Sequence, residues 1–309
     1  MTFSTEIKNE ITKLESNRLE YISELSALVR NSAIIDDTIK IVIENNAVAR
    51  RVYKLLKEIY DVNPSITIRK RIGINKGYSY ILEIKKRIGD ILTDLSIMDK
   101  GLFLNIPKSY IYDDEDTKRA YLRGVFVSTG SINDPKTSRY HLEFIVDDNE
   151  YALFVSSLLN ENNLNSKVIR REKNYMVYVK EADKIADFLR IIKAYNAVMY
   201  FENIRIYKEK KNNTNRLNNC EQANMDKIFM TSSKQLHDIE LLKKWDMIDL
   251  LDEKLQEVIK YRLMYPESSL QELSDIMSKD TGKVITKSGL NHRFRKIKEI
   301  VSNVLNKGE

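Results

Sequence analysis

Residues 24–34 (Glu24-LSALVRNSA-Ile34) and 119–132 (Arg119-AYLRGVFVSTGS-Ile132) set the architecture of this chain, because they are two versions of one predicted helix. Ala27 and Gly124 occupy matching places in the two segments. Small residues let helix backbones approach closely, so we expect the two helices to cross at a pseudo-two-fold axis. The alternative is a helical glycine tolerated at a cost of about 1 kcal/mol. The recurrence of a small residue favours packing.

The two helices open two similar units, repeated at about 100 residues, a period far too long for a solenoid. Runs of β-branched and aromatic residues predict strands, and longer amphipathic runs predict helices. Each unit is expected to be α-β-α-β-β-α, with room for a short extra strand near Ile34–Ile35 and near Ile132, and with Gly73 and Gly77 at a turn. The expected elements after the first helix are 39–45, 46–60, 65–71, 78–84 and 85–95, and then 141–148, 149–161, 166–172, 175–180 and 181–192. The fold class is therefore α+β.

One strand in each unit is basic. Side chains alternate along a strand, so Arg69 and Arg71 share one face of the first basic strand. Arg170 and Arg171 occupy the matching place in the second unit. Two such sheets would straddle a DNA duplex, which makes these four arginines secondary candidates for DNA contact. Ordinary solvated sheet faces explain them equally well.

The stretch 286–304, TKSGLNHRFRKIKEIVSNV, predicts an amphipathic basic helix. Apolar residues of this stretch, together with the residue that follows it, are spaced to share one face: Leu290, Phe294, Ile297, Val301 and Leu305. Arg, Lys and amide side chains occupy the other faces, as a helix in a DNA major groove requires. From residue 283 to 309, seven Lys and Arg stand against two acids, a local charge of +5 in a chain of formal charge +6. The alternative is a solvated charged helix.

The residues before this helix complete a helix-turn-helix pattern over about 268–301. Ser269 and Glu272 have the spacing of a capping box, which begins a short helix. Gly282 is the turn residue of the connector, and Thr286 or Ser288 can cap the basic helix. The three helices are expected to follow in helix-turn-helix order.

The predicted domains are 1–106 and 107–205 for the two units, a polar linker at 206–231, and an all-α helix-turn-helix domain at 232–309. Within the linker, the run 208–215 is a candidate hinge or exposed helix. Ser232 and Gln235 again have capping-box spacing, so we expect a helix to begin there.

Composition limits the function classes. The chain has one cysteine and three histidines far apart in sequence, so no metal site and no cofactor are expected. It has no apolar run of about 18 residues, and we therefore expect no membrane span and a cytoplasmic, nucleoid-associated protein.

Two family resemblances follow from these motifs. LSALVRNSA (25–33) and LRGVFVSTG (122–130) resemble the signature helices of LAGLIDADG homing endonucleases. The segments 119–136, 140–144, 215–225 and 286–297, taken in that order, resemble the WhiA family. The resemblance implies a duplicated LAGLIDADG-like domain followed by a helix-turn-helix domain. It further implies sequence-specific DNA binding in transcription, cell division, chromosome segregation and, in sporulating relatives, sporulation. It adds a sigma factor or RNA polymerase to the possible partners.

The resemblance also allows a catalytic test. A LAGLIDADG nuclease holds divalent metal between two carboxylates, one at the foot of each signature helix. The matching eighth positions here are Ser32 and Thr129, whose neutral hydroxyls are weak metal ligands. Asp36, Asp37 and Asp134 could be invoked as substitutes, but they fall past the predicted helix ends. We therefore expect a protein that is not an enzyme. The rival interpretations are an active homing endonuclease, and an N-terminal domain that serves as a protein-interaction platform.

The expected partner is double-stranded DNA, bound by the basic helix. We expect Asn291, His292, Arg293 and Lys296 to lie nearest the bases or backbone, and Arg295 and Lys298 to contact phosphate or water. The predicted set is completed by Ser269, Lys287 and Ser288.

Overall fold

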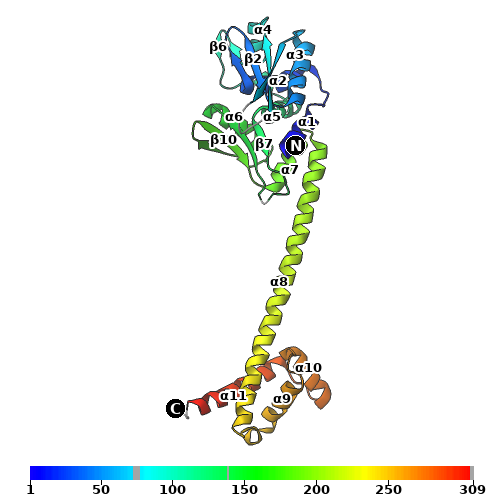
Figure 1. Ribbon diagram of the computed structural model, residues 1–309, viewed down its shortest axis with the longest axis vertical. Coiled ribbons are helices and arrows are strands. Elements are labelled where there is room, and N and C mark those ends of the chain that lie inside the picture. Colours follow the sequence, from blue (N-terminus) through cyan, green and yellow to red (C-terminus); the bar gives the residue numbers. More distant parts are fainter. Residues whose placement is uncertain (72–76, 138, 307–309) are drawn as a thin grey trace. The chain divides into compact units, whose positions relative to one another are not determined.

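A computed structural model of the chain describes residues 1–71, 77–137 and 139–306 (Figure 1). The chain divides into two compact units, 1–208 and 209–309. The predicted turn residue Gly73 lies outside the described ranges. Within those ranges, no helix combines the length and the apolar character needed to cross a membrane.

The first compact unit, residues 1–208, contains both predicted repeats, which are called copies from here on. Each copy includes the short extra strand (Figure 1). The first copy comprises α2 (Arg18–Ser32), β1 (Ala33–Ile35), β2 (Ile39–Ile43), α3 (Asn46–Tyr60), β3 (Ser65–Arg71), β4 (Gly77–Ile84) and α4 (Ile88–Asp94). The second comprises α5 (Glu115–Thr129), β7 (Gly130–Ile132), β8 (Leu142–Val146), α6 (Asn149–Glu161), β9 (Lys167–Arg171), β10 (Asn174–Val179) and α7 (Ala182–Ile191). The α+β fold class is confirmed.

The two four-stranded sheets have the same topology. Their strand orders are β1-β2-β4-β3 and β7-β8-β10-β9, and every neighbouring pair is antiparallel. Strands β2 and β8 bury alternate residues, as side chains with a period of two require. Helices α3 and α6 pack against the buried faces. The opposite faces of β2 and β8 are more exposed.

Helices α2 and α5 cross at Gly124, as the small-residue pattern predicted. A Cβ atom at Gly124 would overlap the carbonyl oxygen of Glu24 and would lie 2.9 Å from Cβ of Ala27. Only hydrogen fits between the two backbones at this point, so the tight crossing explains the glycine.

A buried ion cluster lies beside this crossing. The Glu24 carboxylate accepts hydrogen bonds from Nε and Nη2 of Arg51 and from Nε of Arg123, each at 3.0 Å. All three side chains are nearly inaccessible. Arg123 also lies 3.8 Å from Glu20, and among the described residues its two terminal nitrogens have no hydrogen-bond partner. The cluster joins the two copies, because Glu24 and Arg51 come from the first and Arg123 from the second.

Further elements complete the first unit. They are α1 (Phe3–Ile11), β5 (Met98–Asp99), β6 (Leu102–Phe103) and the 3-10 turn η1 (Ser109–Ile111). Helix α1 was not predicted, and its residues Phe3, Ile7 and Ile11 are buried. Its carboxylate at Glu10 accepts hydrogen bonds from the backbone N–H groups of Asn196 and Ala197 at 2.8 and 3.1 Å. An acceptor at these free N–H groups stabilises the beginning of the next helix.

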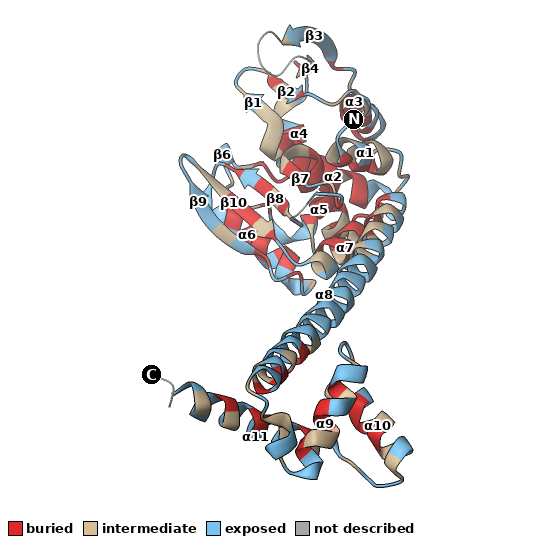
Figure 2. Cartoon of the chain, turned by 60° about the horizontal axis from the view of Figure 1, so that its bottom comes forward, coloured by how far each residue is buried: buried red, intermediate tan, exposed pale blue. Residues whose placement is uncertain are grey.

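That helix, α8 (Tyr195–Lys244), is continuous for 50 residues and belongs to both units. The prediction of a helix start at Ser232 is wrong, because the Ser232 hydroxyl lies within α8 and donates to the carbonyl of Phe229. Residues 206–231 contain neither Gly nor Pro, so nothing in the backbone interrupts the helix before that serine. The middle of α8 is exposed, and Figure 2 shows it in pale blue.

The described part of the second unit, residues 209–306, contains helices and no strand. After the end of α8 come η2 (Ile248–Leu250), α9 (Glu253–Met264), α10 (Leu270–Thr281) and α11 (Lys287–Leu305). Their shared core is formed by Ile239, Leu242, Leu255, Val258, Ile259, Leu273, Met277, Leu290, Phe294, Ile297 and Val301. The predicted apolar face of the basic helix therefore forms part of this core, apart from Leu305, which is exposed.

Candidate nucleic-acid interface

Local capping fixes the turn between α10 and α11. Ser269 and Glu272 form the predicted capping box at the start of α10. Gly282 ends α10 with φ of +66°, a left-handed conformation that favours glycine. Thr286 is the N-cap of α11 and accepts a hydrogen bond from the N–H of Gly289 at 3.1 Å. Ser288 is inside the helix, so Thr286 is the cap of the two that the sequence allowed.

Arg262 on α9 supports the packing of α10 and α11, and it was not predicted from the sequence. Its guanidinium lies 5.4 Å from the ring centre of Phe294, and its Nη1 donates to the carbonyl of Ser268 at 2.6 Å. Burial lowers the pKa of Arg262. A signal did exist: Arg262 continues the spacing of Leu255 and Ile259, which places it on the buried face of α9. From sequence alone, a positively charged side chain at position 262 would be predicted to face solvent, because its backbone carbonyl partners are not apparent in the sequence.

The outward face of α11 carries the larger part of the predicted set. The exposed members are Lys287, Ser288, Asn291, His292, Arg295, Lys296 and Lys298. Lys287, Asn291, Arg295 and Lys298 recur at helical spacing and form one stripe. Among the described residues, no acid forms an ion pair with Lys287, Arg295 or Lys298. This stripe is therefore free to meet phosphates.

Two of the predicted contact residues, Arg293 and Lys296, lie against acids near α9, unlike the cations of the stripe. Arg293 is directed toward α9, where its Nη1 lies 3.6 Å from Glu257, and its side chain is only 23% exposed. Lys296 donates to Asp252 at 2.9 Å, a contact that lowers the pKa of Asp252. Arg293 therefore lies beside α9 and outside the exposed stripe, and its contact with DNA stays a prediction. Position 293 flanks the apolar stripe, whereas 295 lies away from it. Ser269 is partly buried, with its hydroxyl held in the cap.

The eighth positions of the two signature helices end in hydroxyls that are already bonded within their own helices. Ser32 donates to the carbonyl of Leu28, and Thr129 donates to that of Val125 at 2.9 Å. These are the bonds that Ser and Thr form with the preceding helical turn. Neither hydroxyl offers a charge to a cation.

The acids downstream of the helices do not replace them. Asp36 and Asp37 follow β1 in the turn before β2. Asp134 accepts hydrogen bonds from the N–H of Lys136 at 2.9 Å and the hydroxyl of Tyr200 at 3.3 Å. Over the described parts of the chain, no three His, Cys, Asp or Glu side chains are grouped closely enough to hold a metal ion.

The four sheet arginines are not equivalent. Arg69 and Arg71 share the face of β3 that is opposite the core, and Arg71 is ion-paired with Glu44. Arg170 pairs with Tyr175 and Arg171 with Asn174, so the two point to opposite faces of β9. Of these two, Arg171 lies on the outward face, Arg170 is exposed on the other, and contact of either with DNA stays a prediction.

Three family models match the chain. They are the WhiA N-terminal LAGLIDADG-like domain over residues 19–98, the WhiA LAGLIDADG-like domain over 118–211, and the WhiA C-terminal HTH domain over 214–301. The first range covers most of the first copy, and the second begins in α5 and ends within α8. The third begins within α8, ahead of the residue at which we expected the helical domain to start.

Relatives and solved structures agree with these matches. A probable cell division protein WhiA from Staphylococcus saprophyticus is 41% identical, covering 98% of both chains, and one from Macrococcus caseolyticus is 40% identical, covering 99% of this chain and 98% of the relative. The crystal structure of full-length DUF199/WhiA from Thermatoga maritima has a TM-score of 0.58 and 24% identity, covering 98% of this chain and 99% of that one, and supports the fold. With such identity over nearly the whole of both chains, this chain belongs to the WhiA family.

Proposed function

We propose that this protein binds specific sites on double-stranded DNA through α11 and regulates transcription in cell division. The observation that carries the proposal is the exposed stripe of α11, whose cations have no ion-pair partner among the described residues. The inner face of the same helix is packed on Arg262 and the core of α9 and α10, so the stripe is held on a rigid element. The relatives are named as probable cell division proteins, which supports the process.

Within the stripe, we assign base contact first to Asn291 and Arg295. Asn pairs with adenine and Arg with guanine through two hydrogen bonds each, and both side chains are exposed on α11. Lys287 and Lys298 are assigned to phosphate. Lys296 remains available to phosphate because its pair with Asp252 is half exposed on both sides.

The decisive experiment compares variants of exposed residues in the second unit. A crosslinking map of bound genomic sites supplies the duplex, and fluorescence anisotropy measures its affinity. Asn291→Ala and Arg295→Ala should each weaken specific binding by about 1–3 kcal/mol. Lys298→Ala should reduce the salt dependence by about one phosphate contact. The matched control is Lys260→Ala on α9, an exposed lysine without an ion pair among the described residues, which should leave affinity unchanged. Unchanged binding in both base-contact variants would refute the assignment.

We propose further that the protein is not a nuclease, because hydroxyls occupy both positions where the nucleases need carboxylates. Magnesium-dependent cleavage of a plasmid library by purified protein would contradict this. Contact of DNA with Arg69, Arg71 and Arg171 is a secondary proposal, tested by the affinity of a triple Ala variant. The family resemblance also leads us to propose roles in chromosome segregation and sporulation, nucleoid association, and a sigma factor or RNA polymerase as partner, which co-purification with the polymerase tests.

A further inference from the structure

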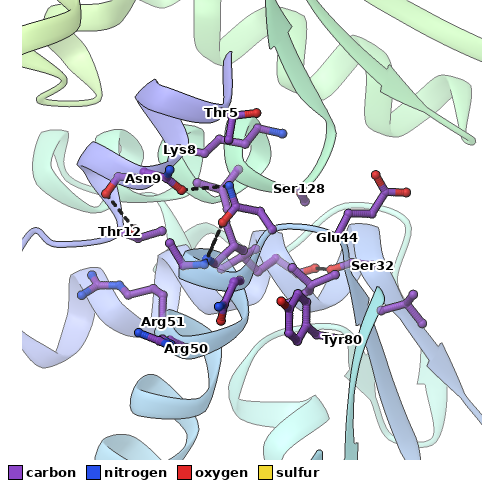
Figure 3. Close-up of a pocket in the computed structure, with 18 of the residues that line it drawn as sticks. Thr5, Lys8, Asn9, Thr12, Ser32, Glu44, Arg50, Arg51, Tyr80 and Ser128 are labelled. Atoms are coloured by element: carbon purple, nitrogen blue, oxygen red, sulfur yellow. Dashed lines mark hydrogen bonds between the residues drawn. The ribbon is translucent and has the colours of Figure 1, made fainter. Parts of the chain in front are cut away.

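A large cleft opens in the first unit beside the ends of the two signature helices. It has a volume of about 1390 Å³ and is lined by parts of α1, α3, β2 and β4, together with Ser32 and Ser128 from α2 and α5 (Figure 3). This is more space than the roughly 300–1,000 Å³ of a typical small-molecule pocket. The cleft is therefore open enough to admit a ligand with several groups.

The cleft is lined by many more basic than acidic side chains. Six basic side chains line the cleft, namely Lys8, Lys13, Arg50, Arg51, Lys54 and Arg71, whereas the lining includes a single acid, Glu44. Arg51 is neutralised by Glu24 and Arg71 by Glu44, and Lys54 lies 3.8 Å from Glu15. Among the described residues, no acid forms an ion pair with the remaining three cations.

Lys8 is the most informative of these three. Its amine extends from α1 into the cleft, 5.6 Å from the ring centre of Phe126 (Figure 3). Burial lowers the pKa of Lys8 to about 8. No acceptor among the described residues takes a hydrogen bond from this amine. The charge of Glu44 offsets part of the effect of burial on Lys8, and an anion in the cleft would give the amine a direct partner.

The wall around Lys8 is preorganised. Asn45 donates from Nδ2 to Asn9 at 3.0 Å, while its Oδ1 caps the N–H groups of Ala47 and Val48 at the start of α3. These bonds tie α1 to the beginning of α3, so the backbones that carry Lys8 and Arg50 are connected. Tyr80 adds a half-buried aromatic surface to the opposite wall.

The electrostatics near the helix ends are thus reversed relative to a LAGLIDADG nuclease. Two carboxylates there would attract a cation, but this chain has hydroxyls and an amine that forms no ion pair among the described residues. Three cations without acidic partners match a ligand that carries more than one negative charge, and amide and hydroxyl groups can complete its hydrogen bonds. We propose that this cleft binds a phosphate-bearing ligand, with Lys8, Lys13 and Arg50 as its cationic contacts. The phosphate belongs either to a free nucleotide or to the backbone of a duplex.

The test uses the full chain with Lys8→Met and Arg50→Gln. Methionine keeps the contact of residue 8 with Phe126, and Arg50 is exposed, so the second variant tests the site even if the first one unfolds. The control is Lys57→Gln, which removes a charge from the same helix α3 at an exposed position outside the lining. Calorimetry measures binding of ATP and inorganic pyrophosphate, and anisotropy measures binding of a short duplex of arbitrary sequence.

For a free nucleotide, ATP and pyrophosphate bind the natural protein and the Lys57→Gln control alike. Their affinity then falls about tenfold or more in both cleft variants, as loss of a hydrogen bond to a charged group predicts. For a backbone phosphate, neither small probe binds, and duplex affinity falls selectively in the cleft variants. The proposal is overturned if both cleft variants behave as Lys57→Gln does with every probe.

Discussion

Glu24→Gln is the sharpest test of how the two copies are held together. The Glu24 carboxylate accepts three charge-assisted hydrogen bonds at 3.0 Å, and its side chain is 1% exposed. Gln keeps the shape but removes the only charge shared by Arg51 and Arg123, and leaves two cations buried side by side. Burial opposes the charge on Arg51, yet the hydrogen bond and charge of Glu24 still raise the pKa of Arg51. Breaking a buried pair in this way costs about 3–5 kcal/mol.

The size of the effect can be checked by calorimetry. At about 2–4 °C for each kcal/mol in a unit of this size, unfolding of the first unit should occur about 6–20 °C lower. The single tryptophan, Trp245, packs in the second unit, so the midpoint followed by its fluorescence should stay in place. The control is Glu15→Gln, which breaks the exposed pair with Lys54 and should cost less than about 1 kcal/mol. If the two variants unfold at the same temperature, the cluster does not hold the copies together.

Three further outcomes are expected. Gly124→Ala should destabilise the first unit by about 1–3 kcal/mol in urea, because its methyl overlaps backbone; Gly89→Ala, which has open space, should not destabilise it, and equal losses would refute the tight crossing. Thr286→Ala should cost about 1 kcal/mol by Trp245 fluorescence, since a helix cap is lost. The pKa of Asp252 is lowered by its bond from Lys296, so that pair stabilises the fold above the ordinary value of 3.8 and is lost as pH falls below it. The free energy of unfolding of Asp252→Asn should therefore be lower than that of the natural protein at neutral pH, and the two values should converge in acid.

The regular elements of both units could be predicted from sequence because their signals are local. Strands β2 and β8 carry a period of two, and α11 carries its apolar residues at helical spacing. The crossing at Gly124 was also predictable, because the duplication supplied two versions of one pattern. The length of α8 was not. A capping pattern such as Ser232 to Gln235 begins a helix only where the preceding residues are not helical. Here the preceding residues already belong to α8.

The chemistry of the sites was harder to predict than their location. The basic helix was found, but the partners of its charges lie on another helix: Glu257 for Arg293 and Asp252 for Lys296. Arg262 was missed because its acceptors are backbone carbonyls six residues or fewer away, which leave no trace in composition. In the sheets, alternation alone separates Arg170 from Arg171. Side-chain pairing across elements depends on packing, and a single sequence does not contain it.

The placement of Glu24 and Arg123 determines how far each copy depends on the other. In the present chain the anion is supplied by one copy and a cation by the other, so the arrangement is no longer symmetric. The second half expressed alone would keep Arg123 without the carboxylate of Glu24, whereas Glu24 in the first half would keep its pair with Arg51. The buried cation of the second copy therefore depends on a carboxylate of the first, and a replacement for the first half would have to supply an acid at the position of Glu24.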